Sequence, residues 1–285
     1  MSVKVSEIWR YPVKSMGGES LEHCHLGSLG LPGDRGFALR DEVVGEIRGA
    51  KKMASLLHCH ARYLSEPEGE HHVPAASIEW PGGKARSDDE DVHARLSEYL
   101  GREVTLWPRQ PEDAHDHYRR RPPDDPDFEK ELRSVFGRTA DEPLPDLGGF
   151  PPEILEFVSP LGTYFDAFSL HLLTTTSLRE AGRLNEEADF DARRFRPNFV
   201  LDPGTDAKGF VEFDWAGKTF RLGSARIRID MPTVRCVMTT LSQPGLEKDP
   251  SVLRTIVSQA EQNLGVYASV IEAGEVRLGD VLEEE

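Results

Sequence analysis

The thiol of Cys236 is a candidate metal ligand or nucleophile in this sequence. It follows a strand-like stretch and the strand-breaking pair Met231-Pro232, so we expect it on a loop at a strand end. Arg235 stands directly before it, and a neighbouring cation favours the thiolate, which binds metals and acts as a nucleophile. The local sequence alone leaves a buried structural cysteine as the alternative.

Two further cysteines stand in unusual triplets, His23-Cys24-His25 and His58-Cys59-His60. In a strand, each pair of histidines would lie on one face and the cysteine on the other. If the two strands were neighbours, four imidazoles could form a metal site. The interpretation that we favour is two strands with exposed histidines and small buried thiols.

Several cations and one hydroxyl stand beside turn-forming residues. Lys14 and Ser15 precede Met16-Gly17-Gly18, and Arg35 follows Gly33-Asp34. Arg196 precedes Pro197-Asn198. In a chain of net charge −16, cations at the starts of loops could gather around an anionic ligand. Ordinary surface charge is the alternative for each cation taken alone.

The composition excludes several classes of protein. The 285 residues carry 34 Lys and Arg against 50 Asp and Glu, whereas a nucleic-acid-binding domain or a polybasic membrane anchor should be basic. We find no apolar stretch of roughly 18 residues and no secretion signal, so we expect no membrane partner. Three widely spaced cysteines favour a reducing cytoplasm over a disulfide framework. The common nicotinamide, flavin, phosphate-loop and Cys-x-x-Cys motifs are absent.

Short strands dominate the first hundred residues. We expect strands over 3–11, 20–26, 36–40 and 56–64, and a short helix that Asp91 caps and Gly101 ends. Several short strands with one helix predict a small barrel or sandwich.

The middle of the chain is rich in proline. Ten of the 20 prolines lie between Pro108 and Pro160, which predicts a long connection with one short helix over 128–136. We therefore place an N-terminal domain over 1–107, a linker or insertion over 108–153 and a second domain over 154–285.

The second half mixes helices with a β core. Ser177 and Glu180 fit a capping box that opens a helix, and alternation over 225–229 predicts the clearest strand. Asp249 begins a helix that we expect Gly265 to end. Further strands are expected over 266–270 and within 274–281. The whole chain is predicted to be α+β and rich in β-structure.

Four motifs occur in a set order, followed by a matching ending over 265–280, and they are Tyr11-Pro12-Val13-Lys14-Ser15, Gly33-Asp34-Arg35, Arg194-Phe195-Arg196-Pro197-Asn198 and Arg235-Cys236-Val237-Met238-Thr239-Thr240. Together they resemble the MOSC-domain proteins, a group that includes the mitochondrial amidoxime-reducing component and its bacterial relatives. The resemblance covers nearly the whole chain, and the proline-rich middle matches least. It implies a small N-terminal β-barrel domain and a MOSC β-barrel domain with flanking helices.

The resemblance also implies a cofactor and an activity. In that family a cysteine thiolate coordinates the molybdenum of a pterin cofactor, and Cys236 falls on that position. Lys14, Ser15 and Arg35 fall on positions that hold the pterin phosphate, which agrees with the preference of phosphate for guanidinium, ammonium and hydroxyl donors. The other implied cofactor contacts are Thr174, Arg196, Asn198 and Arg235. The implied reaction is the two-electron removal of oxygen from an N-hydroxylated compound.

Some features depart from the family. A family arginine is replaced by Lys51, and an ammonium cannot reproduce the two parallel bonds of a guanidinium, so that contact does not carry over. Asp166 is a candidate for the pocket mouth, but the interpretation that we favour is a solvated loop carboxylate. The membrane anchor and ferredoxin-like domain of some members are missing, so we expect electrons from a separate redox protein, for which Arg119–Arg121 are a candidate docking patch.

Two other functions remain open on the sequence. A sulfur carrier or sulfurtransferase would use Cys236 as a persulfide without metal. A non-catalytic carrier of the molybdenum cofactor would hold the metal without turnover.

Overall fold

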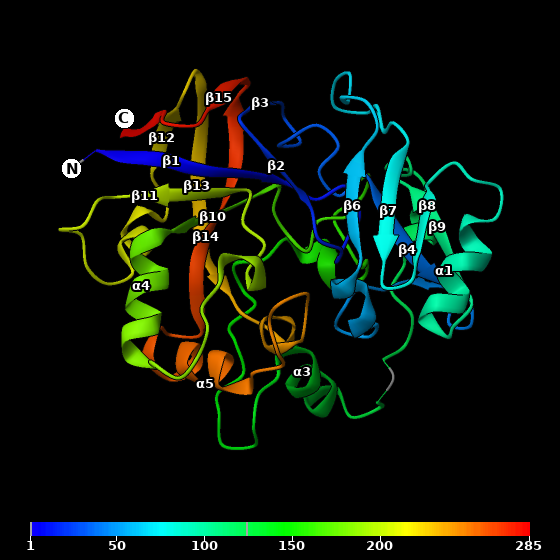
Figure 1. Ribbon diagram of the computed structural model, residues 1–285. Coiled ribbons are helices and arrows are strands. Elements are labelled where there is room, and N and C mark those ends of the chain that lie inside the picture. The colour runs from blue at the N-terminus through cyan, green and yellow to red at the C-terminus, as the bar shows by residue number, and fades with distance from the viewer. Residues whose placement is uncertain (1, 124) are drawn as a thin grey trace.

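The computed structural model describes residues 2–123 and 125–285; Met1, at the start of the predicted N-terminal domain, and Asp124, in the predicted connection, lie outside the described residues. Both ends of this described chain contribute to one closed barrel of seven strands (Figure 1). Their order is β11 (Phe199–Asp202), β10 (Leu170–Thr174), β14 (Asn263–Glu272), β13 (Ala225–Val234), β12 (Thr219–Leu222), β16 (Val281–Glu284) and β1 (Val3–Arg10), which pairs with β11 again. The fold is thus α+β and rich in strands, as predicted.

Strand β1 belongs to this barrel although it opens the chain. Its Ile8 lies opposite Phe199 of β11, and Val3 lies opposite Leu282 of β16. Ile8 and Phe199 are buried in the barrel core together with Ile227 of β13, whose predicted alternation is confirmed. β2 (Glu19–Leu21) continues the sheet beyond β1. The domain boundary at residue 107 stays a prediction. It would place β1 in a different domain from β11 and β16, the strands with which β1 forms a sheet.

The remaining N-terminal strands form smaller sheets beside the barrel, with β6, β7 and β8 on the right in Figure 1. One sheet joins β5 (Glu46–Ile47), β4 (Phe37–Asp41) and β9 (Val104–Pro108), and another joins β6 (His60–Tyr63), β7 (Ala76–Trp80) and β8 (Gly83–Arg86). Helix α1 (Val92–Leu100) ends at Gly101 as predicted and packs into the same core, although Asp91 makes no side-chain cap. The predicted strand over 56–64 starts later than expected, because Ala54–His58 forms the 3-10 helix η1.

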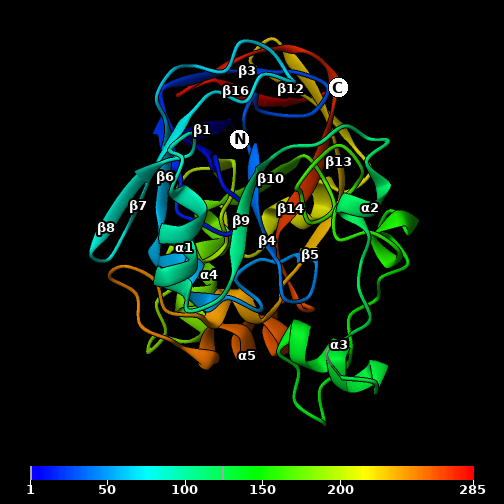
Figure 2. The ribbon, with the colours of Figure 1, turned by 90° about the vertical axis from the view of Figure 1, so that its right-hand side faces the viewer.

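The proline-rich segment is folded rather than extended. It holds α2 (His115–Tyr118), α3 (Phe128–Phe136) and the 3-10 helix η2 (Pro152–Leu155), and α3 matches the predicted helix. Lys52 of the first half pairs with Glu131 of α3 at 2.7 Å, while Arg254 of the second half contacts Glu142 and the carbonyl of Gly137. Both views place α3 close to α5 (Pro250–Gln259) (Figures 1 and 2). The segment therefore connects the two halves by side-chain contacts as well as by the chain itself.

Three predicted boundaries in the second half are wrong. Helix α4 (Thr175–Leu184) is capped by Thr174, which accepts the backbone N–H of Ser177, so the helix begins before the predicted capping box. Helix α5 ends at Gln259, because Glu261 and Gln262 adopt left-handed backbone conformations and Gly265 already belongs to β14. Strand β13 continues through Met231-Pro232 to Val234, with irregular register that accommodates the proline.

A two-stranded sheet and three 3-10 helices are the remaining short elements. These are β3 (His23–Leu26) paired with β15 (Gly274–Arg277), and the 3-10 helices η3 (Ala192–Arg194), η4 (Val211–Trp215) and η5 (Val237–Thr240). Among the described residues no helix is long and apolar enough to cross a membrane.

Candidate functional site

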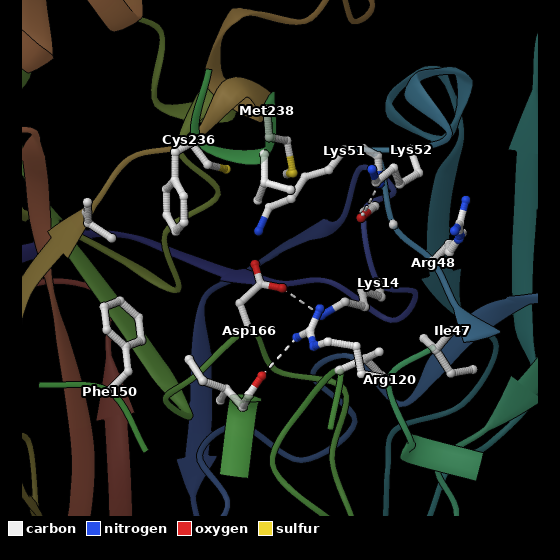
Figure 3. A pocket seen from close by; sticks show the side chains of 18 of the residues that line it. Lys14, Ile47, Arg48, Lys51, Lys52, Arg120, Phe150, Asp166, Cys236 and Met238 are labelled. Atoms are coloured by element: carbon white, nitrogen blue, oxygen red, sulfur yellow. Dashed lines mark hydrogen bonds and ion pairs between the residues drawn. The ribbon is translucent and has the colours of Figure 1, made fainter. Parts of the chain in front are cut away.

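A cavity of about 690 Å³ lies where the two halves and the proline-rich segment meet (Figure 3). Of the described residues, eleven Lys and Arg line it, against four carboxylates. The cations are Lys14, Arg35, Arg48, Lys51, Lys52, Arg119, Arg120, Arg121, Arg194, Arg196 and Arg235, and the acids are Glu46, Glu131, Glu156 and Asp166. In a chain of net charge −16 this excess of cations favours an anionic ligand.

The structure brings seven of the eight predicted site residues to this cavity, namely Lys14, Ser15, Arg35, Arg196, Asn198, Arg235 and Cys236. Cys236 is partly exposed and lies two residues beyond β13, at the start of η5, on the predicted loop. Cys24 and Cys59 are buried, as we expected. Of the described cysteines, Cys236 is therefore the accessible thiol.

Thr174 is the predicted site residue that does not line the cavity. Its side chain is fully buried at the start of α4, where the hydroxyl donates to Glu212 Oε2 at 2.7 Å and accepts from the backbone N–H of Ser177. Thr174 is therefore a helix cap whose hydroxyl has its partners inside the protein. A hydroxyl before a helix is the sequence signal that indicates this role.

Three cavity residues other than glycine have left-handed backbones: Ser15 at φ 68°, Arg35 at φ 49° and Arg196 at φ 56°. Such conformations cost free energy for L-residues and gather at functional sites, where the surrounding structure imposes them. The Ser15 hydroxyl accepts the N–H of Ala50 at 2.9 Å, and a Cβ on Gly49 would lie 2.6 Å from that hydroxyl. Ser15 thus fixes the turn that leads into Lys51.

Arg35 and Asn198 are oriented by the buried carboxylate of Asp34. Asp34 accepts the N–H of Tyr11 at 2.8 Å and contacts Arg35 Nη1. It also accepts the Asn198 amide at 2.9 Å, while Asn198 Oδ1 accepts the N–H of His171 at 3.1 Å. Asn198 therefore acts by holding neighbouring segments in place. Sequence reasoning missed Asp34 in this role, although a carboxylate between a glycine and an arginine in a turn was the available signal.

Arg196 carries a donor without a partner. Its guanidinium lies 4.2 Å from the centre of the Tyr11 ring, and its Nη1 contacts the carbonyl of Met16. Nη2 is buried and has no hydrogen-bond partner among the described residues. Burial, together with the nearby Arg35, lowers the pKa of Arg196 to about 10, so the group remains charged at neutral pH. A buried unpaired cationic donor in a cavity is the arrangement that an anion would complete.

Arg235 is held by the protein behind Cys236. Its Nε donates to the carbonyl of Leu264 at 2.8 Å, and its Nη2 contacts His171 Nε2. Burial lowers the pKa of Arg235 to about 10, and burial beside this cation keeps the pKa of His171 well below its ordinary value. The imidazole of His171 is therefore neutral, and Arg235 brings a fixed positive charge to the cavity wall.

Lys51 and Asp166 both belong to the cavity. Asp166 Oδ1 accepts from Lys14 Nζ at 2.7 Å, and Figure 3 shows Asp166 between Lys14 and Cys236. The Asp166 side chain is 57% exposed, and although its partial desolvation raises its pKa, Lys14, Lys51 and Arg35 lower that pKa by more, to well below its ordinary value. The negative charge that Cys236 can carry raises the pKa of Lys51. Lys51 is thus an ammonium beside the thiol, and Asp166 is a cavity carboxylate.

The first histidine triplet lies in β3, whereas in the second His58 ends η1, Cys59 follows it and only His60 belongs to a strand, β6. β3 pairs with β15, whereas β6 pairs with β7. The predicted alternation is present in β3, where His23 and His25 are exposed and Cys24 is buried. Among the described residues no cluster of His, Cys, Asp and Glu could hold a metal ion, so these histidines do not form the alternative site.

Comparisons with known proteins find a relative of known name and several solved structures. A 119-residue stretch is 28% identical to a molybdenum cofactor sulfurase of Drosophila persimilis, over 39% of this chain and 14% of that much longer protein. Among solved structures, the match to the YUAD protein from Bacillus subtilis covers 100% of this chain and 96% of the YUAD chain, at 10% identity and a TM-score of 0.46. The match to YiiM from Escherichia coli covers 41% of this chain and 54% of the YiiM chain, at 21% identity and a TM-score of 0.31.

Two family models match in sequence order. The MOSC N-terminal beta barrel domain matches residues 2–103, and the MOSC domain matches residues 163–283. Residues 104–162, which include the whole proline-rich segment, lie between the two matched ranges. The chain belongs to the MOSC-domain proteins that carry an N-terminal MOSC β-barrel domain.

Proposed function

We propose that the cavity binds the molybdenum cofactor through the thiolate of Cys236, and that the protein reduces N-hydroxylated compounds with electrons from a separate redox protein. The observation that carries the proposal is the buried, unpaired Nη2 of Arg196 in the cavity that Cys236 also lines. An anionic cofactor with a soft-ligand metal satisfies both groups at once.

The residues present fit such a cofactor. Lys14, Arg35 and Arg196 would hold the phosphate, together with the backbone turn that Ser15 fixes. Cys236 would be the metal ligand, with the ammonium of Lys51 beside it to balance the thiolate charge. When bound, the cofactor would supply two-electron redox chemistry. Overall, two electrons and two protons are consumed as the N–O bond breaks, an N–H bond forms and water leaves.

The chain's own residues would position the substrate. Asp166 remains ionised because three cations surround it, and its Oδ2 makes no hydrogen bond within the described residues. That oxygen is therefore free to accept an N–H from an amidine or a similar nitrogen group. The rings of Phe168 and Tyr267, whose centres are 5.1 Å apart, line the same cavity and would limit access of water to the reacting atoms.

The test is metal content and turnover. Protein produced in a host that makes the cofactor should contain molybdenum and pterin, and it should reduce an aromatic amidoxime to the amidine when reduced viologen dye supplies electrons. Protein that holds the cofactor but does not reduce this substrate or other N-hydroxylated compounds would be a carrier. Protein that holds no molybdenum under these conditions would contradict the proposal.

Sulfur transfer is the second candidate. A free, partly exposed Cys236 beside Lys51 is a suitable persulfide carrier, and the similarity to a molybdenum cofactor sulfurase points the same way. Incubation with a sulfur donor followed by mass spectrometry detects a persulfide on Cys236. A persulfide that transfers to an acceptor, in protein without molybdenum, would establish this function instead.

We further propose that the protein works in a reducing cytoplasm, which keeps Cys236 as a thiol. Its electron donor is a separate redox protein, and no nucleic acid or membrane is involved. The arginines of the candidate docking patch have partners within the chain, such as Glu156 for Arg119 at 2.7 Å and the carbonyl of Gly45 for Arg121 at 3.0 Å. They also line the cavity, so we assign the donor no docking surface.

A further inference from the structure

The proline-rich segment forms one wall of the cavity, and it lies wholly between the two ranges that the family models match. Lining residues come from it between Arg119 and Val158, and the cations Lys14, Arg35 and Arg196 of the flanking segments line the same cavity. If Cys236, Lys14, Arg35 and Arg196 hold the cofactor, this wall faces the space that remains for the substrate. Its side chains should then determine which substrates fit.

Arg120 supplies a charge to this wall without an ionic partner. Its Nη2 donates to the carbonyls of Ile154 at 3.0 Å and Phe157 at 3.1 Å. Among the described residues no carboxylate pairs with it, and its Nε and Nη1 make no hydrogen bond. The neighbouring Arg119 differs, because it pairs with Glu156 at 2.7 Å. Two neutral carbonyls therefore orient the Arg120 guanidinium and leave a side of it free to bind an oxyanion.

The charge of Arg120 extends to the reacting region. It lowers the pKa of Lys51, the ammonium next to Cys236, although that pKa is raised overall by Cys236. Figure 3 shows Arg120 on the same side of the cavity as Asp166. An anion bound to Arg120 would therefore lie in the same cavity as Cys236 and close enough to Lys51 for their charges to interact.

Phe150 from the same segment completes an aromatic cluster. Its ring centre lies 6.4 Å from that of Phe168 and 6.3 Å from that of Tyr267. Burial raises the pKa of Tyr267 to about 12, with further contributions from Asp166 and Cys236, so the phenol is neutral and near both groups. A flat aromatic ring can stack on such a cluster.

We propose that the proline-rich segment is the substrate-selecting part of the site, and that it selects planar aromatic compounds that carry a carboxylate or phosphate. The ring stacks on the cluster of Phe150, Phe168 and Tyr267, and the anionic group binds Arg120. The proposal that these ligands are reduced rests on the proposed function. Their binding does not, because it depends on this wall alone.

Binding to holoprotein without an electron donor tests the site separately from turnover. The probes are benzamidoxime and its para-carboxylate, titrated by calorimetry. The carboxylate should bind more tightly to the parent, and Arg120→Ala should weaken its binding about tenfold or more while leaving the neutral probe unchanged, as expected for loss of a charged hydrogen bond. Arg120→Lys should recover part of the loss, and Arg183→Ala, on the surface of α4 and paired with Glu180, should change nothing.

Phe150→Ala tests the aromatic cluster. It should weaken binding of both aromatic probes and leave acetamidoxime, which has no ring, unaffected. If viologen-driven turnover occurs, the same differences should appear in KM with little change in kcat. Arg120-dependent binding without turnover would support the site and contradict only the reductase function.

An oxyanion at Arg120 could also belong to the cofactor, as the phosphate of a nucleotide extension. Molybdenum and pterin content of Arg120→Ala distinguishes the two sources. Unchanged content with lost preference for the carboxylate supports the substrate role. Reduced cofactor content, or equal binding of the charged and neutral probes by the parent, would overturn it.

Discussion

Arg138 of the proline-rich segment donates a hydrogen bond of 3.0 Å from Nη2 to the carbonyl of Arg235, the residue before Cys236. Its Nε donates to Gln262 Oε1 at 3.0 Å, and the Gln262 carbonyl accepts the N–H of Arg235 at 2.9 Å. The Arg138 side chain is 6% exposed. One buried guanidinium therefore joins the wall of the cavity to the loop that presents its thiol.

Arg138→Ala should destabilise the protein and loosen the Cys236 loop. The substitution leaves the buried carbonyl of Arg235 and the partly buried amide oxygen of Gln262 without this donor, and an unsatisfied buried acceptor such as the Arg235 carbonyl costs about 1–3 kcal/mol. Urea unfolding should show the loss, and the molybdenum content of purified protein should fall. Arg183→Ala is the matched surface control. Unchanged stability and metal content would show that the loop is held by other contacts.

Cys236→Ala and Cys236→Ser should remove molybdenum binding and activity while the fold persists. The side chain is partly exposed, and the N–H of Thr239 bonds to the Cys236 carbonyl, which both variants retain. Circular dichroism and thermal unfolding should match the parent, whereas metal analysis and the viologen assay should not. An alanine variant that reduces an amidoxime at the parent's rate would refute the ligand assignment.

Arg35→Ala and Arg196→Ala should each lower affinity for the cofactor roughly tenfold or more, because a charge-assisted hydrogen bond contributes about 1.5–3 kcal/mol. Arg35→Lys should recover only part, since an ammonium lacks the paired donors of a guanidinium. Loss of Arg35 also leaves the buried carboxylate of Asp34 with one partner fewer, so unfolding must be measured in parallel. Stable variants with unchanged molybdenum and pterin content would reject these contacts.

Local patterns in the sequence were sufficient for much of the site. Helix α3 follows from a capping Asp127 and a terminating Gly137, and both are local signals. The cations at Lys14, Arg35 and Arg196 stand beside turns that give them left-handed or irregular backbones, and the cavity forms where those turns meet.

Features that depend on distant pairing could not be predicted. Strand β1 closes the barrel through contacts with β11, almost two hundred residues later, and nothing within β1 specifies that partner. The proline-rich composition indicated a connection, but its role as a cavity wall depends on contacts such as Glu131 with Lys52. The end of α5 depends on the left-handed Glu261 and Gln262, residue types that carry no strong signal for that conformation.

The isolated chain should be active with reduced viologen dye and inactive with NADH. Direct hydride transfer would need a nicotinamide or flavin site, and the sequence offers no glycine-rich turn between strand and helix for either. It also has no clustered cysteines for an iron–sulfur relay. A purified assay with an amidoxime should therefore need an added reductase system before NADH is consumed. Rapid NADH oxidation by the chain alone would mean that it contains a further cofactor site.

Glu212 is buried beside the start of α4 and should make stability fall as pH rises. Its side chain is fully buried, Oε2 accepts from Thr174 and Ser177 at 2.7 and 2.6 Å, and Oε1 has no partner among the described residues. Burial raises the pKa of Glu212 above its ordinary 4.5, and the two hydroxyls offset part of that rise. The unfolded chain therefore releases this proton at lower pH than the folded one.

Between pH 4.5 and the folded pKa, the native state binds more protons at Glu212 than the unfolded state, so the free energy of unfolding decreases as pH increases. The glutamine of Glu212→Gln cannot titrate. The unfolding free energy of the parent minus that of the variant should therefore be largest below pH 4.5 and decrease as pH rises above it. Urea unfolding of both proteins across this range measures the difference. Glu180→Gln is a control with the opposite expected trend, because Arg183 lowers the pKa of Glu180. The unfolding free energy of the parent minus that of Glu180→Gln should therefore increase as pH rises. A difference that also increased with pH for Glu212→Gln would show that the fold stabilises the ionised carboxylate.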